Sequence, residues 1–292
     1  MIKILKMQII KKIKIYKAKA KFFCKSFLKK ISPWNLYSKY AICRNFYIDD
    51  QIRYKDFSKT DKFVNLGAGS YFFHPRWDCL DFYKDDMNRV HKNYINWDFT
   101  EKKKLPSKYK LAYCSHVIEH IPQKDIYDFL RITFESLKKG AIFRIAVPDA
   151  DAGYEAYAER KLDFFEILTK SFINIPKGYV FEYALLYLFA TPKVRNNRFN
   201  KLVGDEIREN FKKYSKEEFL DSLIEGIDKN SETGMDHVNW FNFKKAEKLL
   251  KRIGFKEVYR SEFGKSKTPA MRDFPLFDGW LPCISLYIEA IK

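Results

Sequence analysis

Residues 62–69 read KFVNLGAG, and residues 111–122 read LAYCSHVIEHIP. In the first stretch an apolar run stops at Gly67 and Gly69, which predicts a buried strand followed by a turn. Glycines leave bare backbone that a ligand can approach closely, and a helix that starts there would offer free N–H groups. The first stretch therefore predicts a turn that holds a nucleotide-sized ligand.

Strand and helix patterns alternate along the chain after this turn. We expect strands over 77–80, 94–97, 110–114 and 141–147, and a helix over 123–137 that is capped by Gly140. Such alternation is typical of a parallel sheet with helices on both faces. The predicted fold class is α/β, with a doubly wound, Rossmann-like sheet.

The pattern changes over 151–234, where segments rich in Tyr, Phe and Leu predict a helical insertion. We expect this insertion to lie over the carboxyl edge of the sheet and to form a cap over the substrate. An amphipathic helix over 242–253 and two strands over 255–259 and 283–291 complete the chain. The predicted organisation is a basic segment, 1–48, followed by one domain, 49–292.

The net charge of +18 is concentrated at the amino end, where twelve lysines and one arginine precede the first acidic residue, Asp49. Residues 1–28 interleave apolar residues with lysines but contain no apolar run long enough for a membrane span or a secretory signal. They predict either an amphipathic helix on anionic lipid or a solvated lysine-rich segment. Because arginine is scarce there and the basic excess does not continue into the body, we expect no nucleic-acid partner.

The five cysteines are scattered along the chain without a C-x-x-C pair. This spacing argues against a disulfide framework and against a structural zinc site. A reducing compartment fits best, so we expect a cytoplasmic protein, peripheral at the inner face of the membrane if its basic segment binds lipid.

Two acidic residues stand where predicted strands end. Asp81 follows the second strand, where a carboxylate can accept hydrogen bonds from ribose hydroxyls, although a turn or cap role is the alternative. Asp98 follows the third strand and could accept from an adenine amino group or from backbone. Phe72 stands where a dinucleotide fingerprint needs its third glycine, which disfavours an NAD enzyme.

Taken together, several motifs resemble the class I S-adenosylmethionine-dependent methyltransferases, and within them a bacterial branch associated with surface-polysaccharide biosynthesis. The resemblance extends over about 60–150 and rests on NLGAG at 65–69, Asp81, SHVIEHI at 115–121 and FRIAVPD at 143–149. It implies a seven-stranded sheet whose last strand is antiparallel, with S-adenosylmethionine across the carboxyl ends of strands one to four. The cofactor-binding positions that it implies are Asn65, Gly67, Gly69, Asp81, Asp98, Ser115 and His116.

Two positions depart from the family pattern, since Asn65 replaces an acidic residue and Tyr71 replaces a glycine. Asn65 can form hydrogen bonds, but it offers no carboxylate to the ammonium group of the cofactor. These departures motivate an alternative function, a non-catalytic scaffold of the same fold that is tethered to the membrane by its basic tail.

Methyl transfer needs alignment of the two reactants, and a base when the acceptor is a hydroxyl group. Each candidate base also has a structural interpretation as a buried or capping residue. From the resemblance we expect the acceptor to be an oxygen or nitrogen of a small molecule, a sugar or surface-glycan precursor. The candidate bases are His116, His120, His237 and Asp149.

A competing interpretation is a zinc hydrolase, because His116, Glu119 and His120 match the H-x-x-E-H pattern of zinc peptidases. That chemistry needs both histidines on one face of a sustained helix. Pro122 follows two residues later, and an apolar strand directly precedes the segment. We therefore predict a strand-to-helix turn here and expect no metal ligands.

Overall fold

The computed structural model describes residues 52–69, 72, 74, 76–82, 94–169, 174–227, 236–273 and 276–292. The basic segment 1–48 and Tyr71 lie outside these residues. The chain divides into two units, Met1–Asp56 and Phe57–Lys292, and the second unit contains the sheet and the site described below. Among the described helices, none combines the length and the apolar character needed to cross a membrane.

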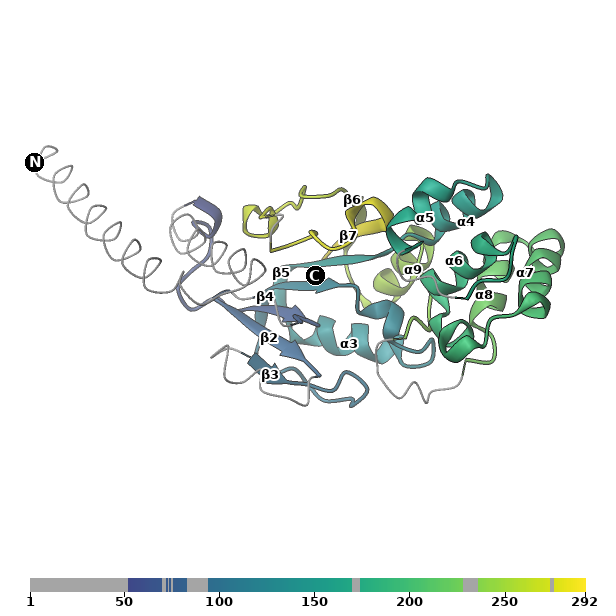
Figure 1. Ribbon diagram of the computed structural model, residues 1–292. Coiled ribbons are helices and arrows are strands. Elements are labelled where there is room, and N and C mark those ends of the chain that lie inside the picture. Colours follow the sequence, from purple (N-terminus) through teal and green to yellow (C-terminus); the bar gives the residue numbers. More distant parts are fainter. Residues whose placement is uncertain are drawn as a thin grey trace, which may run out of the picture. The chain divides into compact units, whose positions relative to one another are not determined.

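In the described part of the chain, seven strands form one sheet in the order β3-β2-β1-β4-β5-β7-β6 (Figure 1). Strands β1 to β5 run parallel to one another, whereas β7 runs antiparallel to both β5 and β6. This arrangement confirms the doubly wound sheet with an antiparallel last strand. The strands are β1 (Phe63–Leu66), β2 (Trp77–Asp81), β3 (Tyr94–Asn96), β4 (Tyr109–Ser115), β5 (Leu137–Pro148), β6 (Glu257–Ser261) and β7 (Ser285–Ile291).

Two helices, α3 (Ile126–Ser136) and α9 (Phe243–Ile253), share one apolar cluster with the sheet. Helix α9 begins where the side chain of Asn242 accepts a hydrogen bond from the N–H of Lys245, and it ends at Gly254, whose φ is 121°. Its buried side confirms the amphipathic helix predicted over 242–253.

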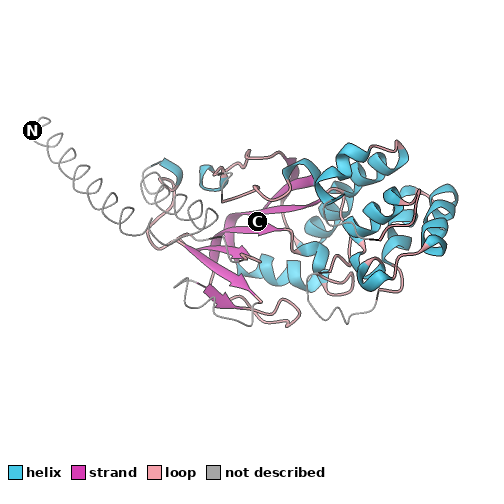
Figure 2. Cartoon of the chain, in the orientation of Figure 1, coloured by secondary structure: helices cyan, strands magenta, loops and turns pink. Residues whose placement is uncertain are grey.

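Five helices follow β5 and pack around a second apolar cluster of their own. Figure 2 shows them gathered at one end of the strands. They occupy the segment predicted as a helical insertion, and a 3-10 turn, η5 (Thr191–Lys193), interrupts it at the Thr-Pro pair. The helices are α4 (Ala150–Ala158), α5 (Leu162–Thr169), α6 (Val180–Phe189), α7 (Lys201–Lys213) and α8 (Lys216–Ile224).

The predicted cap of α3 by Gly140 is wrong. The helix ends at Ser136, and Leu137 already pairs with Tyr109 as the first residue of β5. Gly140 lies inside that strand with a φ of 70°, beside a shift in register between Tyr109 and Leu111 on β4. The strand begins early because Leu137, which is buried, joins the core directly after the helix.

A buried ion cluster connects β5 and β7 to the loop that lies between β6 and β7. Arg144 on β5 lies opposite Glu289 on β7 and contacts its carboxylate at 3.0 Å. The same guanidinium donates to Asp278 at 2.9 and 2.5 Å, and all three side chains are fully buried. Glu289 is buried because the loop between β6 and β7 covers it, with the N–H of Lys267 donating to its Oε2 at 2.9 Å.

Candidate functional site

The carboxyl ends of three strands meet at one edge of the sheet. Leu66 at the end of β1 pairs with Leu80 on β2 and with Cys114 on β4, so the next residues, Gly67, Asp81 and Ser115, are neighbours. The chain leaves β1 toward β2 on one side and later returns to β4 on the other. In open α/β sheets, this reversal of strand order is where ligands bind.

The two glycines after β1 have different surroundings. Gly67 has a φ of 74°, and a Cβ atom at this position would clash with Cγ2 of Val117. Gly69 has a φ of 58° and has no atom near the position of a Cβ. Close packing thus requires a glycine at the first position, whereas the second leaves bare backbone facing open space.

Asp81 holds this turn in place. Its Oδ2 accepts a hydrogen bond from the N–H of Gly69 at 2.5 Å, and its Oδ1 accepts from the N–H of Phe82 at 2.7 Å. Burial raises the pKa of the carboxyl group, and the two N–H donors oppose that rise. Each oxygen keeps a second lone pair that can accept from a ribose hydroxyl. Sequence reasoning missed the contact with Gly69, which only the folded turn creates.

Asn65 supplies an unsatisfied acceptor two residues before Gly67. Its side chain is 3% exposed, and Oδ1 accepts no hydrogen bond from the residues that the structure describes. A buried acceptor without a donor is costly, by about 1–3 kcal/mol. A ligand that brings a donor such as an ammonium group would remove that cost.

The carboxylates of Asp98 and Asp149 both have hydrogen-bond or ion-pair partners in the protein. Oδ1 of Asp98 accepts from the N–H and the hydroxyl of Thr100, which closes a turn after β3. Asp149 caps α4, and its Oδ2 lies 2.6 Å from a guanidinium nitrogen of Arg260. Burial raises the pKa of Asp149, while Arg260 and the capping N–H groups oppose the rise. Their roles as adenine acceptor and base stay predictions.

His116 follows β4 with a φ of 52°, a conformation that is costly for a residue with a side chain. Its Nε2 lies 2.9 Å from Oγ of Ser285, which itself donates to the carbonyl of Leu281. Because that hydroxyl has one hydrogen, Ser285 accepts from Nε2 of His116. The other ring nitrogen, Nδ1, lies 3.1 Å from Oε1 of Glu119.

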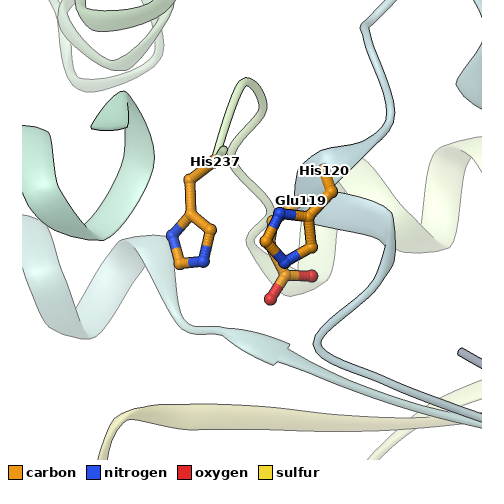
Figure 3. A group of neighbouring side chains, drawn as sticks. All are labelled: Glu119, His120 and His237. Atoms are coloured by element: carbon orange, nitrogen blue, oxygen red, sulfur yellow. The ribbon is translucent and has the colours of Figure 1, made fainter. Parts of the chain in front are cut away.

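Three of the chemistry-bearing side chains form a cluster: Glu119, His120 and His237 (Figure 3). The first two lie on a 3-10 turn, η4 (Ile118–His120), and the third comes from a segment more than a hundred residues later. The carbonyl of Glu119 accepts from the N–H groups of Val238 and Asn239, at 2.8 and 3.1 Å. These bonds fix the later segment against η4. The two imidazole centroids lie 4.8 Å apart.

Burial and charge act against each other in this cluster. Burial would raise the pKa of Glu119, but the contact with His116 and the positive charges that His116, His120 and His237 can carry lower it to about 2. Burial lowers the pKa of His237 to about 4, against the attraction of Glu119. At neutral pH Glu119 is therefore ionised and His237 is neutral.

The structure lacks the sustained helix that the zinc-peptidase interpretation requires. Helix η4 has three residues and ends before Pro122, so His116 and His120 do not lie on one sustained helix. This confirms the predicted strand-to-helix turn. The sequence pattern nevertheless missed the grouping of Glu119 and His120 with His237, because no local spacing connects them. The Asp-His dipeptide at 236–237 gave no signal of its partners.

Among known proteins, no family model and no curated protein matches the chain. Similar solved structures include an S-adenosylmethionine-dependent methyltransferase from Archaeoglobus fulgidus, with 12% identity, a TM-score of 0.40 and coverage of 93% of this chain and 98% of that chain. Another is an S-adenosylmethionine-dependent methyltransferase from Mesorhizobium loti, with 15% identity, a TM-score of 0.40 and coverage of 79% of this chain and 90% of that chain. Human N-acetylserotonin methyltransferase with S-adenosylmethionine has 11% identity, a TM-score of 0.37 and coverage of 79% and 47%, so this chain spans about half its length. This chain also spans 60% of the length of a similar protein from Nostoc punctiforme. These sequence identities and TM-scores are too low to indicate a shared activity.

Proposed function

We propose that the protein transfers a methyl group from S-adenosylmethionine to an oxygen or nitrogen of a small acceptor. One observation supports this above the others. The glycine turn, the carboxylate of Asp81 and the unsatisfied Oδ1 of Asn65 lie together at the carboxyl ends of β1 and β2, where strand order reverses. These groups suit the backbone contacts, the ribose hydroxyls and the ammonium group of that cofactor.

The proposed cofactor site assigns a task to each strand end. The backbone at Gly67 and Gly69 would line the methionine end, with Asn65 accepting from the ammonium group. Asp81 would hold the ribose, as its remaining lone pairs allow. The adenine side would be formed by Asp98, and the wall at the end of β4 by Ser115 and His116. When bound, the cofactor supplies a methyl group already activated on its sulfonium.

The protein's own contribution would be positioning, and proton removal where the acceptor is a hydroxyl group. His120 and His237 each use Nδ1 on a backbone carbonyl, at 3.0 and 2.6 Å, so Nε2 is the nitrogen that can accept a proton. Nδ1 of His116 lies 3.1 Å from Oε1 of Glu119. Asp149 suits this task less well, because both of its oxygens already have partners.

The proposal also includes the class of the acceptor, the cap over the substrate and a contact with the membrane. The acceptor class, a sugar or surface-glycan precursor, rests on the sequence resemblance. Helices α4 to α8 follow the carboxyl end of β5 directly, which supports residues 151–234 as the cap over the substrate. Residues 1–28 would add peripheral contact with the inner face of the membrane to an otherwise cytoplasmic enzyme.

Calorimetric titration of the full chain with S-adenosylmethionine tests the proposal. We expect saturable binding, and we expect Asp81→Ala to weaken it by about 1–3 kcal/mol, a factor of roughly 5 to 150, because two ribose hydrogen bonds are lost. The matched control is Asp163→Ala on the exposed side of α5, which should bind like the wild type.

Absence of binding at about 1 mM cofactor would reject the proposal. That result would favour the second candidate function, a non-catalytic scaffold of the same fold, which Asn65 and Tyr71 motivate. Equal affinity of the wild type and Asp81→Ala would instead remove Asp81 from the site.

A further inference from the structure

The hydrogen-bond partners of His120 and His237 determine which ring nitrogen of each is free. Nδ1 of His120 lies 3.0 Å from the carbonyl oxygen of Asp236, and Nδ1 of His237 lies 2.6 Å from that of Leu188. A carbonyl oxygen only accepts, so each Nδ1 carries a hydrogen. In a neutral imidazole the other nitrogen, Nε2, then presents a lone pair.

A third acceptor lies beside these two lone pairs. The side chain of Glu119 is 1% exposed, and neither of its oxygens accepts a well-directed hydrogen bond from the described residues. Nδ1 of His116 lies 3.1 Å from Oε1 of Glu119, and because Nε2 of this ring carries a hydrogen toward Ser285, Nδ1 presents a lone pair in the neutral ring. The cluster therefore brings together three acceptor groups of the described residues, whose ligand atoms all lie within 4.8 Å of one another. Acceptors that face one another in a partly buried site are stabilised by a positively charged group between them, a proton or a metal cation.

We propose that Glu119, His120 and His237 bind a divalent first-row transition-metal ion such as Zn²⁺. Two imidazole nitrogens and one carboxylate oxygen are a donor set that zinc uses in catalytic sites, where a fourth position stays open. The Nδ1–H groups bound to backbone carbonyls match the outer contacts that orient metal-bound histidines.

The surrounding backbone holds the three ligands close to the required distances. Metal–ligand bonds of about 2.0–2.2 Å place the ligand atoms of a tetrahedral site about 3.4 Å apart. A pair at the 4.8 Å limit would therefore close by about 1.4 Å through side-chain rotation. The carbonyl of Glu119 anchors Val238 and Asn239, and the hydroxyl of Thr191 accepts from the N–H of His237 at 2.7 Å. His120 and His237 are only partly buried, which gives an ion access from solvent.

This set differs from the one in the H-x-x-E-H pattern. His116 uses Nε2 on Ser285, so it stands outside the ligand set and orients Glu119 instead. Glu119 and His120 follow the carboxyl end of β4, on the edge where the cofactor is proposed to lie. The open position would accept an oxygen or nitrogen of the methyl acceptor, a role that rests on the proposed function, whereas the metal site itself does not. With the ion bound, Nε2 of His120 and of His237 would be a ligand and would not serve as the base.

The test is titration of the chelator-treated full chain with ZnCl₂ by calorimetry and with CoCl₂ by visible absorption. We expect one equivalent of each ion to bind. Glu119→Gln and His237→Gln should each lower the affinity at least about 10-fold. His74→Gln, which removes a buried histidine elsewhere in the fold, is the matched control and should bind like the wild type.

Thermal unfolding separates lost binding from lost folding. Zinc should raise the melting temperature of the wild type and of His74→Gln, since an ion that binds only the folded state stabilises it, and should raise that of Glu119→Gln by less at the same zinc concentration. The metal-free variants should melt cooperatively, which shows that they fold. Because the exposed thiol of Cys283 can also bind zinc, Cys283→Ser must retain full binding.

The proposal is overturned if neither ion binds stoichiometrically, if Glu119→Gln and His237→Gln both bind like the wild type, or if binding disappears in Cys283→Ser. The first result would mean that the cluster holds only protons. Titration of the metal-free chain with S-adenosylmethionine is independent of these results, so failure of the metal site and failure of the cofactor site can be told apart.

Discussion

At the residue scale, the turn after β1 contains two glycines that are needed for different physical reasons. Gly67 has a positive φ and also lacks room for a side chain, because Val117 packs against it. Gly69 has only the positive φ, and its N–H is bound by Asp81. The sequence shows two glycines at this turn, and the structure shows which one the packing requires.

Gly67→Ala should therefore destabilise the fold by about 2–4 kcal/mol, from backbone strain and overpacking together. Gly69→Ala adds a methyl group in open space and should cost about 1 kcal/mol. Urea unfolding measures both changes. Adding Val117→Ala to Gly67→Ala should recover part of the loss, and equal costs for the two single variants would contradict the packing argument.

At the element scale, α9 presents a lysine to the base of the helical insertion. Nζ of Lys245 lies 2.9 Å from Oδ1 of Asn239 and 4.0 Å from the centre of the Trp240 ring. Burial lowers the pKa of Lys245 to about 8, against the attraction of Asp221. The amphipathic pattern of the helix predicts its buried face, but not that this lysine would be desolvated.

The depressed pKa of Lys245 predicts a pH dependence of stability. Between about pH 8 and 10.5 the unfolded chain holds a proton that the folded chain has lost, so the free energy of unfolding should rise with pH in this window. Below pH 8 both states are protonated and the cost of burying the charge is constant.

Lys245→Met should remove this contribution, which is about 3 kcal/mol across the window from pH 8 to pH 10.5. Denaturant unfolding at several pH values measures it, as the difference in slope between variant and wild type. Lys244→Met is the matched control, because its side chain is exposed and pairs with Glu217. A slope that is identical in wild type and Lys245→Met would contradict the prediction.

At the scale of the whole sheet-containing unit, one ion cluster connects segments that lie far apart in sequence. Arg144 on β5 contacts Glu289 on β7 and Asp278 in the loop between β6 and β7, all without exposure to solvent. That loop covers the face of the sheet opposite to α3 and α9, and Phe277 packs there against Trp77 and Tyr113.

Arg144→Met should destabilise the protein by about 3–5 kcal/mol, because it leaves two carboxylates buried without their partner. Replacing Arg144, Asp278 and Glu289 together by apolar residues of similar volume should cost much less. Arg131→Met, which breaks an exposed pair with Glu135, should cost under about 1 kcal/mol. Thermal and denaturant unfolding measure the stability of these three variants. A loss of less than about 1 kcal/mol in Arg144→Met would refute the buried-charge argument.

Most of the sheet could be predicted from the sequence, because strands such as β1 and β4 are short, largely apolar runs that end at a turn signal. The predicted cap at Gly140 failed because Leu137 joins the core directly, which depends on a partner strand and not on local propensity. Of the site, Gly67, Asp81 and Ser115 could be placed together because carboxyl ends of parallel strands share an edge.

The sequence by itself determined the fold class, the strand ends and the glycine turn, since these depend on residues close together in the chain. Only the tertiary structure decided the contact of Asp81 with Gly69, the unsatisfied acceptor of Asn65 and the meeting of Glu119 and His120 with His237. Those features arise from backbone hydrogen bonds between distant segments, which periodicity and spacing do not encode. The chemistry proposed for the protein therefore depends on both levels.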